Sequence, residues 1–168
     1  MTPKHPYLIG KEWKEGASCA PVANPYNNKV IGEVSMAEER DILEAIALAE
    51  NAFEKTKRLP AYLRSRICAQ IADGIKNRAE EFAKTISIES GKPLIYSRAE
   101  VTRSISAFQI ASEEANRLGG EVLDLDITES SRDKMGIIRR FPIGPVSGIS
   151  PFNFPLNLVA HKVAPAMA

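Results

Sequence analysis

The sequence has little of what several classes of protein require. Its two cysteines and two histidines are too few for a disulfide framework, and none stands at metal-ligand spacing. Lys and Arg number 22 against 21 for Asp and Glu, so the net charge of +1 lacks the basic excess of a nucleic-acid-binding protein. No apolar run is long enough for a transmembrane helix, and the N-terminus has no apolar segment of a secretory signal. These absences predict a cytoplasmic protein with reduced thiols and no metal, nucleic acid or membrane partner.

The chain does have a globular composition, with 44% hydrophobic and 26% charged residues in a length of 168. Such a chain can bury a core of its own. Its first third carries strand and turn patterns. Residues 7–13 are typical of a hairpin that turns at Gly10, residues 24–28 of a turn, and residues 29–34 of a short strand.

Helical periodicity follows from residue 35 to residue 120. Ser35 and Glu38 have the spacing of a capping box, which predicts a first helix that stops near Lys57. The apolar face of this helix repeats every three or four residues: Ile42, Ala45, Ile46, Ala49 and Phe53.

Three further helices are predicted from apolar repeats and from the residues that begin and end them. The second begins at Pro60, and Asn77 separates it from the third. Gly91 ends the third helix, Pro93 begins the fourth, and the fourth stops at the glycine pair 119–120. Cys68 lies on the apolar face of the second helix, where a core role is favoured over a catalytic one.

After the glycine pair, residues 121–127 and 135–141 read as two strands joined by a polar connector. An isolated hairpin is marginal in water, so this one is expected to associate with something else. Residues 146–150 then read as a strand, and residues 156–168 as a helix. This strand and helix either open a parallel βαβ unit, or the strand pairs antiparallel with an earlier one and the helix caps the fold.

The segment between them is the candidate for chemistry. Asn153 stands between two phenylalanines, and Pro151 and Pro155 bracket the three and stiffen the loop. An Asn amide held at the end of a strand can donate to a developing oxyanion, as ligands of open α/β sheets bind at strand ends. Alternatively, Asn153 closes an Asx turn that merely shapes the loop. Neither cysteine stands beside a general base in the sequence.

Several segments closely resemble the aldehyde dehydrogenase superfamily. They are Phe141-Pro-Ile-Gly-Pro-Val, Ile149-Ser-Pro-Phe-Asn-Phe-Pro-Leu, His161-Lys-Val-Ala-Pro-Ala, Glu89-Ser-Gly-Lys-Pro and Asn24-Pro-Tyr. The resemblance implies an α/β fold of short N-terminal strands, about four helices, an oligomerising β-hairpin, and the first strand and helix of a Rossmann-like sheet. It divides the chain into residues 1–120 (part of the cofactor domain), 121–142 (the hairpin) and 143–168 (the first βα unit, truncated).

The resemblance also implies roles for individual residues. Asn153 corresponds to the family's oxyanion donor and Lys162 to the lysine beside its proton-relay path, although Lys162 can also be read as a helix-surface lysine. Phe154 and Leu158 correspond to the substrate tunnel, and Arg103 falls close to another tunnel position. A cation there suits an acidic or phosphorylated aldehyde, and a solvated helix arginine is the alternative. The residues implied to line the nicotinamide side of an NAD or NADP site are Ile149, Ser150, Pro151 and Phe152.

The resemblance therefore implies a parent enzyme that oxidises a small-molecule aldehyde through a cysteine thiohemiacetal and works as a homo-oligomer, a dimer or tetramer. Within the superfamily, the sequence most resembles lactaldehyde, semialdehyde and non-phosphorylating glyceraldehyde-phosphate dehydrogenases. The family's nucleophilic cysteine, general base and ribose-binding residues are expected beyond Ala168, so the chain alone is expected to be inactive. An alternative is a short, non-catalytic form that acts as an assembly or binding module through its hairpin.

Overall fold

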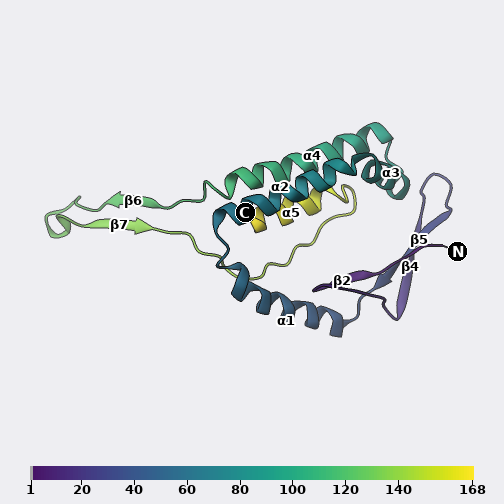
Figure 1. Ribbon diagram of the computed structural model, residues 1–168, viewed down its shortest axis with the longest axis horizontal. Helices are drawn as coiled ribbons and strands as arrows, with labels where there is room; N and C mark the ends of the chain where they lie inside the picture. The colour runs from purple at the N-terminus through teal and green to yellow at the C-terminus, as the bar shows by residue number, and fades with distance from the viewer. Residues whose placement is uncertain (1) are drawn as a thin grey trace.

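The computed structural model describes residues 2–168, which form an α/β fold of five α-helices and several small sheets (Figure 1). Strands β1 (Lys4–His5), β5 (Val30–Met36) and β4 (Ser18–Ala23) make a three-stranded sheet in that order, in which β1 runs parallel to β5 and β4 antiparallel. Strand β4 was not predicted, because Pro21 interrupts its pattern. Proline is tolerated there since β4 is an edge strand.

The predicted hairpin at the N-terminus is confirmed. Strands β2 (Tyr7–Ile9) and β3 (Glu12–Lys14) pair antiparallel, and Gly10 takes the left-handed conformation with φ of 60° at the turn. Glycine adopts this conformation without the steric cost that a side chain would add.

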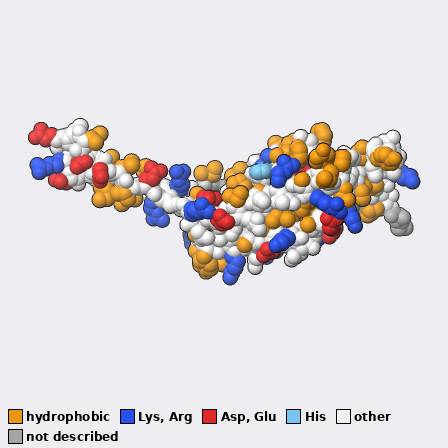
Figure 2. All heavy atoms as spheres, turned by 90° about the horizontal axis from the view of Figure 1, so that it is seen from above, with side chains coloured by type: hydrophobic (Ala, Val, Ile, Leu, Met, Phe, Trp, Pro, Cys, Tyr) orange, Lys and Arg blue, Asp and Glu red, His pale blue; other side chains and the backbone are white. Residues whose placement is uncertain are grey.

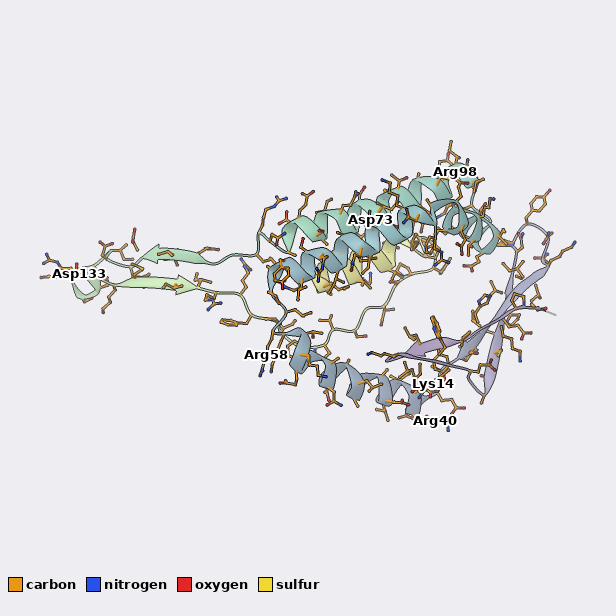
Figure 3. All side chains as sticks on the ribbon, in the orientation of Figure 1. Lys14, Arg40, Arg58, Asp73, Arg98 and Asp133 are labelled. Carbon is orange, nitrogen blue, oxygen red and sulfur yellow. The ribbon has the colours of Figure 1, made fainter. Side chains whose placement is uncertain are left out.

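Helix α1 (Glu39–Thr56) differs from its prediction in two respects. Its capping box is made by Glu38 and Asp41 rather than by Ser35 and Glu38. Its apolar face is largely exposed, with Ile42 at 55% and Ile46 at 51% of full exposure. The helix packs on the hairpin through the Tyr7 hydroxyl, which donates to Asp41 Oδ2 at 2.7 Å. In Figure 3, Lys14 and Arg40 lie at its N-terminal end, away from the other helices.

The core lies among α2 (Ala61–Asn77), α3 (Ala79–Ser90), α4 (Leu94–Glu114) and α5 (Asn157–Met167). The predicted boundaries at Asn77, Gly91 and Pro93 are confirmed, and Gly91 ends α3 with φ of 70°. Alanines let α5 approach closely, because Ala160 and Ala164 are fully buried against this core. Its other buried members are Cys68, Ala72, Ile75, Ala83, Ile86, Val101, Phe108 and Ala111.

Strands β6 (Glu121–Asp124) and β7 (Met135–Ile138) form the predicted second hairpin, with a 3₁₀ turn (Glu129–Ser131) near its tip. The hairpin projects far from the helices, and Asp133 marks its end (Figures 1 and 3). Hydrophobic side chains gather along it (Figure 2), and Ile127 is 86% exposed and Ile137 70%.

The strand predicted over residues 146–150 is not formed. Within residues 2–168 it has neither a parallel nor an antiparallel partner, so its backbone is extended but unpaired, and Val146 and Ile149 are exposed. A strand requires a neighbour to accept and donate its hydrogen bonds. None of the helices described is both long and apolar enough to cross a membrane.

Candidate active site

The loop that carries Asn153 lies between the extended segment and the first turn of α5. Asn153 is exposed, and its backbone is part of a turn. Elsewhere, Asn24 and Asn27 close Asx turns by accepting the backbone N–H groups of Tyr26 and Lys29. The Asn153 side chain makes no such bond to any described residue, so the Asx-turn alternative is not realised. Its carboxamide is free to donate to a ligand.

A buried carboxylate lies under this loop. Glu100, on α4, has no solvent exposure at all. Its Oε1 accepts the backbone N–H groups of Leu156 at 3.0 Å and Asn157 at 3.2 Å. These are the first amides of α5, a helix with no capping side chain and no acidic residue in its own first turn. Glu100 therefore supplies from another helix the acceptor and the negative charge that a helix N-terminus favours.

Lys92 contacts both Glu100 and the backbone of the Asn153 loop. Its Nζ lies 2.5 Å from Glu100 Oε2 and donates at 3.0 Å to the backbone carbonyl of Asn153. The same nitrogen stands 4.0 Å from the ring centroid of Phe154, a cation–π contact. The backbone of Lys92 is held in turn, because Ser87 Oγ donates to its carbonyl and Ser90 Oγ accepts from its N–H.

Lys92 and Glu100 are functional candidates that the sequence did not predict. Lys92 appeared only as part of the Glu-Ser-Gly-Lys-Pro segment, and no single Asp or Glu stood out in the sequence. One signal could have found Glu100: it falls at helical spacing among Ser97, Val101 and Ser104, all of which are buried. A carboxylate on such a face requires a partner.

Arg103 lies beside the same loop. Its guanidinium carbon is 5.2 Å from the Phe154 ring centroid. Two cations therefore stand over this ring: Arg103 from α4 and Lys92 from the connection between α3 and α4. Phe154 and Leu158 are half-buried, whereas Arg103 is exposed and able to meet a ligand. The structure thus brings together Asn153, Phe154 and Arg103, three of the residues singled out in the sequence.

A groove of about 600 Å³ lies next to the loop. Residues Val146 to Ser150 form one wall, and the other wall is the face of α5 with Val159, Lys162 and Val163. Its volume falls in the range of cofactor pockets, roughly 300–1,000 Å³. Ile149, Ser150 and Lys162 therefore line one groove, while Pro151 and Phe152 stand outside it and Phe152 is 91% exposed.

The two cysteines are poor candidates for a nucleophile. Cys68 is fully buried in the helical core, and burial raises the pKa of its thiol. Cys19 is exposed on β4, outside the helical core that carries the loop. The described residues contain no cluster of three or more His, Cys, Asp or Glu able to hold a metal ion.

Comparison with known proteins agrees with the family resemblance of the sequence. The model of the family described as "Aldehyde dehydrogenase family" matches residues 13–168. The 3-sulfolactaldehyde dehydrogenase of Priestia aryabhattai is 36% identical over 160 residues, which are 95% of this chain and 33% of that protein. The lactaldehyde dehydrogenase of Methanocaldococcus jannaschii is 42% identical over 147 residues, 88% of this chain and 30% of that protein. The chain spans about a third of the length of these curated relatives.

Solved structures match over nearly the whole chain. Aldehyde dehydrogenase 21 of Physcomitrella patens, in complex with the reaction product succinate, matches with a TM-score of 0.95 and 43% identity. The match covers 99% of this chain and 35% of that chain. The NADP-dependent glyceraldehyde-3-phosphate dehydrogenase of Bacillus halodurans, complexed with NADP, has a TM-score of 0.92 and 30% identity, with coverage of 98% and 35%. A betaine aldehyde dehydrogenase variant of Staphylococcus aureus in complex with NAD⁺ has a TM-score of 0.88 and 34% identity, with coverage of 97% and 32%.

Proposed function

This chain belongs to the aldehyde dehydrogenase family, and from that premise we propose that it supplies the oxyanion-binding side of a site that oxidises an aldehyde to a carboxylate with NAD or NADP. The observation that carries the proposal is the exposed carboxamide of Asn153 on a loop whose backbone is held by Lys92 and Glu100. A donor that is already oriented stabilises developing charge without reorganisation during the reaction, which is the basis of oxyanion-hole catalysis.

In the proposed reaction, a cysteine thiolate attacks the aldehyde carbon to give a thiohemiacetal oxyanion. The Asn153 amide donates a hydrogen bond to that oxyanion. Loss of hydride gives a thioester, which water then hydrolyses to the carboxylate. The nucleophile and the general base come from residues other than those of this chain, because Cys68 is buried and Cys19 lies on β4.

A nicotinamide nucleotide, when bound, accepts the hydride. Residues 149–152 are proposed to bind it, with Ile149 and Ser150 on the groove wall and Pro151 and the exposed Phe152 outside the groove. Lys162, across the groove on α5, is half-buried, and its stem packs near Gly148. Its ammonium group is proposed to lie beside the path by which a proton leaves the reacting site.

The substrate is proposed to carry an anionic group. Arg103 stands over Phe154 at the edge of the loop, with Leu158 following on α5. A guanidinium at this place would bind a carboxylate, phosphate or sulfonate through charge-assisted hydrogen bonds. Three of the names support this class, since sulfolactaldehyde, glyceraldehyde phosphate and the acid succinate carry such groups, whereas lactaldehyde and betaine aldehyde do not.

The test is aldehyde-dependent reduction of NAD and NADP, followed by absorbance, with a panel of acidic and neutral aldehydes. The complete polypeptide of the relatives' length that carries these residues should reduce nucleotide and favour an acidic aldehyde. The 168-residue chain alone should not, because Cys68 is buried in the helical core and Cys19 lies on β4, so neither can attack an aldehyde at the Asn153 loop. Turnover by the purified 168-residue chain, or none by the complete polypeptide with any aldehyde, would refute the proposal.

A second candidate function is assembly. The apolar side chains exposed along β6 and β7 favour a role for residues 121–142 as an interface between copies of the chain, as in a dimer or tetramer. This interface serves either a complete enzyme or a non-catalytic binding module. Residues 1–120 and 143–168 would then form the cofactor-binding part on one side of it, and the protein would act in the cytoplasm.

A further inference from the structure

We infer that Lys92 and Glu100 are positioning residues for Asn153, a charge pair from α3–α4 that sets where the catalytic carboxamide stands. This inference rests on the proposed function. It is carried by a set of contacts that converge on the loop from residues 56 to 61 positions earlier in the chain.

Glu100 fixes the far end of the loop. The first amides of α5 converge on a single carboxylate oxygen, so the position of that oxygen decides where the helix begins. Because Leu156 and Asn157 follow Asn153 by only three and four residues, the start of α5 limits how far the loop can shift. The carboxylate itself cannot move easily, since it is fully enclosed between α4 and α5.

Lys92 fixes the near end. Its ammonium donates to the carbonyl oxygen of Asn153 itself, and so holds the peptide plane next to the residue that carries the carboxamide. The ring of Phe154, the following residue, packs on the same ammonium. Each of these contacts depends on the other half of the pair, because the carboxylate of Glu100 anchors the Lys92 ammonium.

The chain offers a matched control. Glu80 on α3 and Arg98 on α4 form a second ion pair near the same connection, with Arg98 Nε at 2.8 Å from Glu80 Oε1. That pair is more than half exposed, and Arg98 lies at the end of α4 farthest from the hairpin (Figure 3). Its loss removes a link between α3 and α4 but leaves the loop contacts intact.

The experiment measures kcat, nucleotide Kd and thermal stability of Lys92→Met, Glu100→Gln and Arg98→Met in the complete polypeptide. Lys92→Met should lower kcat by about 10²-fold, the scale of a roughly 1 Å misplacement of a reacting group. Nucleotide Kd should change by less than about twofold, since the groove is untouched, and Arg98→Met should leave both values near wild type. Glu100→Gln should also lower kcat, because one of the two acceptor oxygens becomes an NH₂ donor, which leaves either the Lys92 ammonium or the first amides of α5 without an acceptor.

A double variant separates positioning from a general loss of structure. If Lys92 acts only through Asn153, then Lys92→Met should slow an Asn153→Ala enzyme by no more than about threefold, because interacting residues are not additive. A full additional loss would overturn the inference, as would a wild-type kcat for Lys92→Met. If Asn153→Ala itself leaves kcat unchanged, the proposed function fails and this inference fails with it.

Lys92→Arg covers the case in which Lys92→Met does not fold. Arginine keeps the charge and the pairing with Glu100, but its planar fork cannot reproduce one ammonium donating to a carboxylate and a carbonyl together. It should fold and still lose about tenfold in kcat. A folded Lys92→Arg enzyme with wild-type kcat would contradict the inference.

Discussion

Glu100 shows how one residue can join two distant parts of a chain. A carboxylate with no solvent exposure has a large desolvation cost, which is offset only when its oxygens are paired. Here the oxygens are paired with one ammonium and with the amides of a helix that begins more than 50 residues later. Glu100 therefore couples the helix bundle to the Asn153 loop, alongside the contacts of Lys92.

Arg103 is predicted to select the substrate. Replacing it with Met should raise KM for an acidic aldehyde by about 10- to 100-fold, the scale of one hydrogen bond between charged groups. KM for a neutral aldehyde of similar size should stay within about twofold. Arg98→Met, five residues earlier on the same helix, is the control. Equal effects on acidic and neutral aldehydes would show that Arg103 does not contact the anionic group.

Cys68 is predicted to be unreactive in the folded chain. A thiol reagent should modify only Cys19 under native conditions and both cysteines in denaturant, and Cys19→Ser should abolish the native reaction. Burial raises the pKa of the Cys68 thiol above its ordinary value, so the unfolded chain releases this proton first as pH rises. The free energy of unfolding should then fall above that ordinary value, by at most about 1.4 kcal/mol per pH unit. Cys68→Ala should remove this slope, and its persistence in that variant would contradict the assignment.

The residues that could be singled out from the sequence are those whose setting is local. Cys68 could be placed in the core because its neighbours on the helix are apolar, and Asn153 stood out because prolines and phenylalanines surround it. Lys92 and Glu100 could not be paired with the loop, because no local pattern indicates a contact across 61 residues. The role of Asn153 itself stays a prediction until its turnover is measured.

At the scale of elements, the left-handed backbone conformation that ends α3 is predicted to require glycine at position 91. Gly91→Ala should lower the free energy of unfolding by about 1–2 kcal/mol, since a side chain in the left-handed region has this cost. A Cβ there would also lie 3.3 Å from Pro25. Gly74→Ala, in the middle of α2 with no atom within 4 Å of the added Cβ, should instead stabilise by about 0.5–1 kcal/mol. Chemical denaturation measures both, and similar changes in the two variants would contradict this account.

Element boundaries could be predicted where glycine, proline or a break in periodicity ends a helix, as at Asn77, Gly91 and Pro93. Two expectations differed because they depended on packing rather than on local pattern. The apolar face of α1 predicted burial, yet this face is largely exposed, and the β2–β3 hairpin contacts the helix near its N-terminus. The apolar segment 146–150 predicted a strand, yet no neighbouring strand is present among the described residues.

At the scale of the whole molecule, the projecting hairpin is predicted to mediate self-association. Ile137→Lys should lower the weight-average mass in sedimentation equilibrium, because it places a charge on the exposed apolar hairpin. Ile95→Lys is the matched control, since Ile95 on α4 has nearly the same exposure, 71% against 70%. A chain that is monomeric at all concentrations, or an equal effect of both variants, would argue against the hairpin as the interface.

The most direct test of the account is the turnover of Asn153→Ala in the complete polypeptide. The account predicts a kcat about 10²- to 10³-fold below wild type, the loss typical of one oxyanion-hole donor, with nucleotide Kd and thermal stability nearly unchanged. Asn51→Ala, on the exposed surface of α1, should have the wild-type rate. A near-wild-type kcat for Asn153→Ala would contradict the central claim that this loop stabilises the oxyanion of aldehyde oxidation.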